Sequence, residues 1–150
     1  MDYSEVQEGF VESVVEFGPF EEELYSIYIP NPPLPDQIRD VIVRLDVLYA
    51  KVLKEYIRAK IVYENIEDMA DEIIKSSKTQ GSNSEARAAK AYEAARTAEL
   101  GSLGQVNLLE LRRCARARYL YLQDILKAID KKHERLITIE GAYGIEAKLT

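Results

Sequence analysis

The chain has 150 residues, 47% of them hydrophobic, which is the length of one domain with enough apolar material to bury a core. Its net charge of −6 is concentrated in residues 1–35, whereas the remaining residues hold 18 acids and 20 bases, and this balanced part gives no indication of general nucleic-acid binding. No apolar run reaches the roughly 20 residues that cross a bilayer, and the single cysteine excludes an internal disulfide. The start of the chain lacks a basic leader pattern, so we expect no secretory signal and a cytoplasmic protein.

Residues 1–35 form an acidic, aromatic arm with eight carboxylates, all three Phe residues and no Lys or Arg. Apolar spacing predicts a short helix over 3–17, capped by Ser4 and ended at Gly18-Pro19, before a Pro-rich connector. Carboxylates interleaved with aromatic rings suit docking on a basic, apolar groove, imitation of a nucleic-acid backbone, or an ordinary covering helix. The residues predicted to bind a partner are Phe10, Phe17, Phe20, Glu21, Glu22, Glu23 and Tyr25.

An apolar seam at alternating steps of four and three predicts a long helix from an Asp36 cap to about Ser77. Spacing of 3.5 residues keeps such a seam facing a partner helix over its whole length. Tyr49, Tyr56 and Tyr63 share one heptad position, so we expect them in a core or subunit interface. The seam consists of Ile38, Ile42, Leu45, Tyr49, Val52, Tyr56, Ala59, Tyr63, Ile66, Ala70 and Ile73.

A second helix is predicted after the polar turn at 79–83, from a Ser84 cap to about residue 140. Its first part is rich in alanine, and Gly101 and Gly104 could mark a kink or a close helix approach. Gly141 to Gly144 should end it and leave 141–150 as a tail. Apolar residues recur every seven positions at Leu108, Ala115, Leu122, Ile129 and Leu136.

Two long helices around a tight turn predict an all-α fold, with a long antiparallel helical hairpin (a coiled coil) over 36–140 and a short N-terminal helix. With a bend near Gly81, residue 81−k faces residue 81+k, which brings the basic run at 112–116 level with Asp46. Apolar residues outside the seams, such as Val43, Val47 and Ile57, make a band too wide for two helices. We therefore expect a dimer or tetramer that forms a helical bundle.

The densest basic run provides a possible nucleic-acid face, because arginine beside aromatic rings can hold single-stranded nucleic acid by charge and stacking. The alternative is ion pairing with Asp46, the arm or a partner subunit. The face comprises Arg112, Arg113, Arg116 and Tyr119, and the residues expected in the helix seam or oligomer interface are Tyr49, Tyr56, Tyr63, Leu108, Leu122 and Ile129.

No motif for catalysis is present. Glu64, Asp68, Asp71 and Glu72 share much of one helix face, but the single histidine, His133, lies in no Glu-x-x-His pattern of the kind that binds metals in bundles. The chain also has no glycine-rich phosphate loop and no clear Ser/His/Asp or Cys/His set. We expect no enzyme, no cofactor and no metal.

The stretches from Leu48-Tyr49-Ala50-Lys51 to Glu64, Lys75 to Asn83, Ser84 to Ala89 and Tyr119 to Arg135 resemble small bacteriophage helical-hairpin proteins. In these, a helix rich in Tyr and Lys bends at a polar turn into a helix rich in Ala and Arg. The resemblance implies a phage accessory role in DNA metabolism or host takeover, in the host cytoplasm. The sequence therefore predicts a non-enzymatic protein that self-associates and binds another protein; the alternative is an accessory protein that binds single-stranded DNA or assists recombination.

Overall fold

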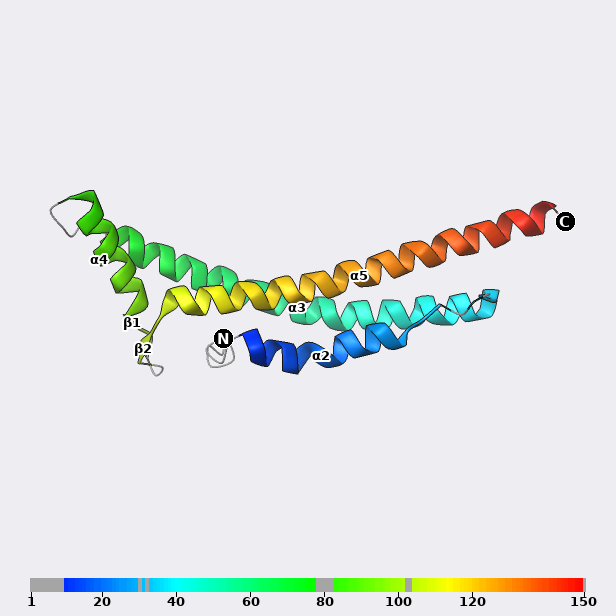
Figure 1. The fold of residues 1–150 in the computed structure, drawn as a ribbon, viewed down its shortest axis with the longest axis horizontal. Coiled ribbons are helices and arrows are strands. Elements are labelled where there is room, and N and C mark those ends of the chain that lie inside the picture. Colours follow the sequence, from blue (N-terminus) through cyan, green and yellow to red (C-terminus); the bar gives the residue numbers. More distant parts are fainter. Residues whose placement is uncertain (1–9, 30, 32, 78–82, 102–103, 150) are drawn as a thin grey trace. The chain divides into compact units, whose positions relative to one another are not determined.

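The computed structural model describes residues 10–29, 31, 33–77, 83–101 and 104–149. Within these ranges the chain forms α2 (Phe10–Ser26), α3 (Pro35–Ser77), α4 (Ser84–Arg96), β1 (Ala98–Glu99), β2 (Gln105–Val106) and α5 (Leu108–Leu149), in the order shown in Figure 1. The predicted all-α hairpin is confirmed: the two long helices, α3 and α5, pack together, and α2 is the short N-terminal helix.

Two compact units are present. Of the described residues, the first contains 10–14, 57–77, 83–101 and 104–120, and the second contains 15–29, 31, 33–56 and 121–149, so α3 and α5 contribute to both. The predicted seams lie on the inner side of these helices. Every seam position of α3 is buried or half-buried, and Leu108, Ala115, Leu122, Ile129 and Leu136 of α5 are all buried.

The core of the first unit joins the second half of α3 to the first half of α5 and to the β-hairpin. β1 and β2 pair antiparallel, with Ala98 opposite Val106. Small residues allow close packing here, since Ala91 and Ala95 of α4 are fully buried. The main cluster consists of Val62, Ile66, Ala70, Ala98, Val106, Leu108, Leu111 and Ala115.

The second unit is a three-helix arrangement in which α2 covers the first half of α3 and the second half of α5. Side chains of α5 fix α2 in place: Tyr121 Oη donates to Glu21 Oε2 at 2.7 Å, and Lys132 Nζ donates to the Leu24 and Ile27 carbonyls at 2.7 and 2.8 Å. Lys51 of α3 lies 4.0 Å from Glu23. Large buried residues of this core are Ile27, Ile38, Leu45, Leu48, Val52, Leu122, Ile129 and Leu136.

The predicted helix end at Gly18-Pro19 is wrong, because α2 continues through both residues to Ser26. A proline inside a helix removes one backbone hydrogen bond and costs about 3 kcal/mol. Burial offsets this cost, since Phe17 stacks on Phe20 with ring centroids 5.8 Å apart and Leu24 is buried one turn later. The predicted start of this helix, with the Ser4 cap, lies outside the described residues.

The second predicted helix is divided in two. α4 ends at Arg96, and the β-hairpin separates it from α5. Gly101 (φ +50°) and Gly104 (φ +68°) adopt the left-handed backbone that the reversal requires, so they form a turn and not a kink. Asn107 then caps α5, since its side-chain oxygen accepts from the backbone N–H groups of Leu109 and Glu110 at 3.1 and 3.2 Å.

This division changes the pairing of the two long helices. Asp71 lies 3.4 Å from Arg112, where the predicted register places residue 91, and Tyr56 contacts Gln123, where it places residue 106. The predicted register, with residue 81−k facing 81+k, is therefore wrong, because residues 84–106 form α4 and the β-hairpin. The predicted bend at Gly81 lies outside the described residues.

Helix ends also differ from their predicted positions. Leu34, and not Asp36, precedes the first helical residue of α3, where Pro35 occupies the favoured first position and Gln37 Oε1 accepts from the Leu34 N–H at 3.1 Å. Asn83, and not Ser84, caps α4. α5 continues through Gly141 and Gly144 to Leu149, so the predicted tail over 141–150 is helical as far as Leu149.

Candidate functional site

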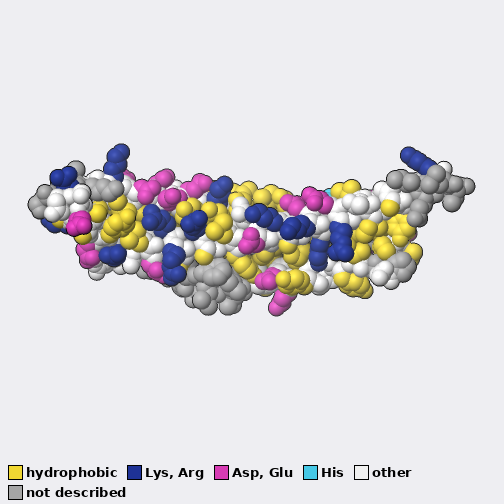
Figure 2. Space-filling model, turned by 45° about the horizontal axis from the view of Figure 1, so that its top comes forward, with side chains coloured by type: hydrophobic (Ala, Val, Ile, Leu, Met, Phe, Trp, Pro, Cys, Tyr) yellow, Lys and Arg dark blue, Asp and Glu magenta, His cyan; other side chains and the backbone are white. Residues whose placement is uncertain are grey.

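The outer face of α3 carries exposed hydrophobic side chains. Val43, Val47, Ile57 and Ile61 are 60%, 50%, 49% and 51% exposed. At 3.6 residues per turn, these four positions fall within roughly 80° of the helix circumference, opposite the buried seam. Figure 2 shows that exposed hydrophobic side chains and Lys or Arg side chains lie among one another on one face of the molecule. We call Val43, Val47, Ala50, Lys54, Ile57 and Ile61 the outer stripe of α3.

The tyrosine positions of α3 face inward. Tyr49, Tyr56 and Tyr63 are all half-buried, and Tyr63 lies against Tyr119 of α5 with ring centroids 4.9 Å apart. Burial, followed by a hydrogen bond with Glu67, raises the pKa of Tyr63. These rings pack between α3 and α5 within each unit. Leu108, Leu122 and Ile129, predicted with them, are fully buried.

The basic run of α5 is partly used in ion pairs. Arg112 Nη1 lies 3.4 Å from Asp71 Oδ1, and Arg113 binds both carboxylate oxygens of Glu110 one turn earlier on the same helix. This pairing lowers the pKa of Glu110. Arg116 is exposed, and its positive charge acts on the Tyr63 phenol. The predicted partner Asp46 is not used here, because it lies 3.4 Å from His133.

Arg118, the next arginine on α5, does not share the exposed surface of Arg116, because it is buried with 4% of its surface exposed.

The acidic arm is divided between internal contacts and exposed side chains. Phe17 is buried against the second unit's core, and Glu21 and Glu23 contact Tyr121 and Lys51. Glu22 and Tyr25 point outward, and Tyr25 is 71% exposed. For Phe10, only its position as the first residue of α2 is described. Of the residues predicted to bind a partner, Phe17, Glu21 and Glu23 thus hold α2 in its own unit.

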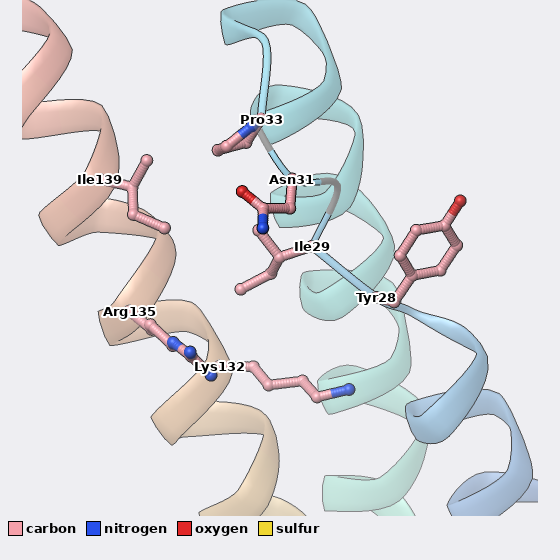
Figure 3. Close-up of a pocket in the computed structure, with 7 residues that line it drawn as sticks. All are labelled: Tyr28, Ile29, Asn31, Pro33, Lys132, Arg135 and Ile139. Carbon is pink, nitrogen blue, oxygen red and sulfur yellow. The ribbon is translucent and has the colours of Figure 1, made fainter.

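A groove of about 520 Å³ lies in the second unit between α5 and the connector that follows α2. Figure 3 shows Lys132, Arg135 and Ile139 of α5 on one side and the connector residues on the other. Lys132 donates to the carbonyl of Leu24 in α2 and to that of Ile27, the residue after α2 ends, and burial lowers the pKa of this amine. Among the described residues that line the groove, two are cations and none carries a carboxylate: Tyr28, Ile29, Asn31, Pro33, Lys132, Arg135 and Ile139.

A smaller hollow of about 200 Å³ surrounds the contact between His133 and Asp46, with Tyr49, Ile129 and Asp130. Here His133 connects α5 to α3 at a polar interruption of the seam. Among the described residues, no group of three or more His, Cys, Asp or Glu side chains is arranged to hold a metal ion. The interaction that the structure shows at this hollow is the contact of His133 Nε2 with Asp46 Oδ1 at 3.4 Å, which is an ion pair when the imidazole is protonated.

Two features were absent from the sequence predictions. The β-hairpin has a local signal in Gly101, Gly104 and Asn107, which are turn and cap residues within a short stretch. The connector groove has no comparable signal, because it depends on side chains more than a hundred positions away from the connector.

Comparison of the chain with protein-family models, curated proteins and solved structures finds no match in any of the three. None of the described helices combines the length and apolar character required to cross a membrane.

Proposed function

We propose that the chain is a non-enzymatic helical protein that self-associates through the outer stripe of α3. The observation that carries this proposal is the exposure of four large aliphatic side chains, Val43, Val47, Ile57 and Ile61, on one face of one helix. Single exposed apolar residues are ordinary, whereas a row of them at helical spacing is typical of a face that another helix covers.

The size of the stripe predicts a contact of modest strength. Each of these side chains is about half exposed, so burying the remainder contributes about 1 kcal/mol. Eight such side chains in two copies give roughly 8 kcal/mol. The association cost starts at about 4 kcal/mol, so at most about 4 kcal/mol remains to hold the two copies together. The difference of at most about 4 kcal/mol corresponds to a dissociation constant in the millimolar range, so we expect a monomer at high dilution.

Sedimentation velocity over a wide concentration range tests self-association. It compares the wild type with two single variants, Val47→Glu and Ile57→Glu. Each places a charge in the proposed contact and should shift the protein to monomer. Ile137→Glu is a matched control, because Ile137 is 51% exposed on α5 and Ile57 is 49% exposed on α3. Circular dichroism checks that each variant keeps its helices.

The proposal predicts weaker association for the two α3 variants and unchanged association for Ile137→Glu. A wild-type chain that stays monomeric at several millimolar concentration would refute it. So would equal weakening by all three substitutions, since the stripe would then have no special role.

The predicted second partner is another protein, and the exposed side chains of the arm support this part of the proposal. Glu22, Tyr25 and Tyr28 remain outward while their neighbours hold α2 in place. A carboxylate beside two exposed phenol rings suits a basic, apolar partner surface. An accessory or host-takeover role in a bacteriophage stays a prediction from the resemblance.

Single-stranded DNA binding is the second candidate function. It is favoured by the exposed guanidinium of Arg116 beside the paired rings of Tyr63 and Tyr119. An electrophoretic assay over a salt series should then give binding that falls steeply with salt and weakens with Arg116→Ala. Lys75→Ala, which removes an exposed cation elsewhere, serves as the control. No binding at low salt excludes this function.

A further inference from the structure

We propose that the connector groove of the second unit binds a phosphate monoester that carries an apolar group. The groove lies between α5 and the connector after α2, and both of its walls belong to the same compact unit. Its volume of about 520 Å³ falls within the range of small-molecule sites, about 300–1,000 Å³. This inference goes beyond the proposed self-association and does not rest on it, because it concerns a different surface and a different kind of ligand.

Two cations lie on one face of α5 in this groove. Lys132 and Arg135 are three residues apart, so their side chains emerge close together, and Ile139 follows on the same face one turn after Arg135. None of the described lining residues carries a carboxylate, and within the described part of the chain neither cation forms an ion pair. The positive charge of the groove is therefore free to attract an anionic ligand.

The ammonium group of Lys132 keeps its charge and one donor for a ligand. It donates to the carbonyl oxygens of Leu24 and Ile27 at 2.7 and 2.8 Å, which uses two of its three N–H groups. Both acceptors are neutral, so they leave its positive charge uncompensated. Burial lowers the pKa of this amine, and an anion placed beside it would offset the lost solvation.

The opposite wall contributes an amide and apolar surface. Figure 3 shows Ile29 and Asn31 of the connector directed toward α5, and Ile139 directed toward the connector. The Asn31 amide can donate to a phosphate oxygen, and the planar guanidinium of Arg135 can donate to two of them at once. Ile29, Pro33 and Ile139 are all half-buried, and they offer surface that an apolar group of the ligand can cover.

The pair of cations favours a phosphate monoester over a carboxylate. At neutral pH a phosphate monoester carries a charge of about −1.5 to −2 and three strong acceptor oxygens, whereas a carboxylate carries a single charge and two oxygens. The apolar wall favours an organic ester over inorganic phosphate, which has no apolar group to cover it. Phenyl phosphate combines both features and serves as the probe.

Titration of the full chain with phenyl phosphate at low salt, followed by nuclear magnetic resonance, tests the site. We expect shifts of the Asn31 side-chain amide and Ile139 methyl signals, with a dissociation constant in the low millimolar range that suits so small a ligand. Benzoate, with one charge, and inorganic phosphate, without the ring, are titrated in parallel. Each should bind at least about fivefold more weakly than phenyl phosphate.

Variants of exposed residues connect the signal to the groove. Arg135→Gln removes the guanidinium and should weaken binding of phenyl phosphate about tenfold, and Asn31→Ala, on the opposite wall, should weaken it about threefold. Lys131→Gln is the matched control, because Lys131 is an exposed cation of α5 that does not line the groove. It should leave the dissociation constant unchanged to within about twofold. Circular dichroism checks that each variant keeps its helices.

A response at Asn31 and Ile139 that weakens with Arg135→Gln and Asn31→Ala, and not with Lys131→Gln, supports the site. No response at these residues well above the expected dissociation constant overturns it, and so does equal affinity of wild type and Arg135→Gln. Equal weakening by Arg135→Gln and Lys131→Gln would reduce the effect to net charge and also overturn it. If benzoate or inorganic phosphate binds as tightly as phenyl phosphate, the assigned ligand class is wrong. Sedimentation velocity measures the self-association separately.

Discussion

Replacing Tyr121 with Phe removes the hydroxyl that joins α5 to α2. Tyr121 Oη donates to Glu21 Oε2 at 2.7 Å in a partly buried position. A hydrogen bond to a charged group contributes about 1.5–3 kcal/mol, and partial exposure places this one near the lower limit. We expect Tyr121→Phe to reduce the free energy of unfolding by about 1.5 kcal/mol, which for a chain of this size lowers Tm by about 3–6 °C.

Urea unfolding followed by circular dichroism measures this loss. Tyr25→Phe is the matched control, because Tyr25 belongs to the same unit and is 71% exposed. It should change the free energy of unfolding by less than about 0.5 kcal/mol. Equal stabilities of the Tyr121→Phe and Tyr25→Phe variants would refute the packing of α2 against α5 that this contact represents.

The same contact predicts a difference in pH dependence. Burial, then the hydrogen bond to Glu21 and its negative charge, raise the pKa of Tyr121 from 10.0 to about 12. The folded state favours the neutral phenol, so stability from this group is present below about pH 10 and is lost as the pH rises through about 12. The stability difference between wild type and Tyr121→Phe should therefore shrink over this interval. A constant difference would contradict the assignment.

Three further changes can be measured by the same unfolding assay. Asn83→Ala should cost about 1 kcal/mol, because the Asn83 side chain accepts from the Ala86 N–H at 2.8 Å at the start of α4; no loss would contradict that cap. Gly104→Ala should cost about 1 kcal/mol through its φ of +68°, although no atom lies within 4 Å of the added Cβ. Gly141→Ala, in α5 without a positive φ, should be neutral or stabilising, and equal losses at both glycines would refute this account. Lys132→Met should cost about 2 kcal/mol, because the carbonyls of Leu24 and Ile27 lose its hydrogen bonds; a loss no greater than that of Lys131→Met at the neighbouring exposed lysine would exclude this role.

The long helices could be predicted because periodicity reports burial directly. The steps of four and three from Ile38 to Ile73 describe the inner side of α3, and the seven-residue repeat from Leu108 to Leu136 describes the inner side of α5. Such patterns depend only on which face is covered. Sequence spacing also showed that the apolar band of α3 is wide, and Val43, Val47, Ile57 and Ile61 are the part that stays exposed.

Boundaries and register could not be predicted in the same way. Gly18-Pro19 is a strong local stop signal, but the burial of Phe17 and Leu24 outweighs it. The alanine-rich stretch of α4 has the same helical character as α5, so its separation by a turn at Gly101 and Gly104 was not recognised. That error displaced every cross-helix pair, including those assigned to Arg112 and Asp46, since register depends on where the chain turns.

Part of the attachment of α2 and its connector uses main-chain groups. Lys132 binds the carbonyls of Leu24 and Ile27, and Tyr143 Oη donates to the carbonyl of Pro33. Main-chain acceptors are the same whichever residue carries them. Tyr25, Tyr28 and Asn31 can therefore be randomised in a display library while the segment stays anchored. The connector offers a site where new recognition could be selected without redesigning the helices beneath it.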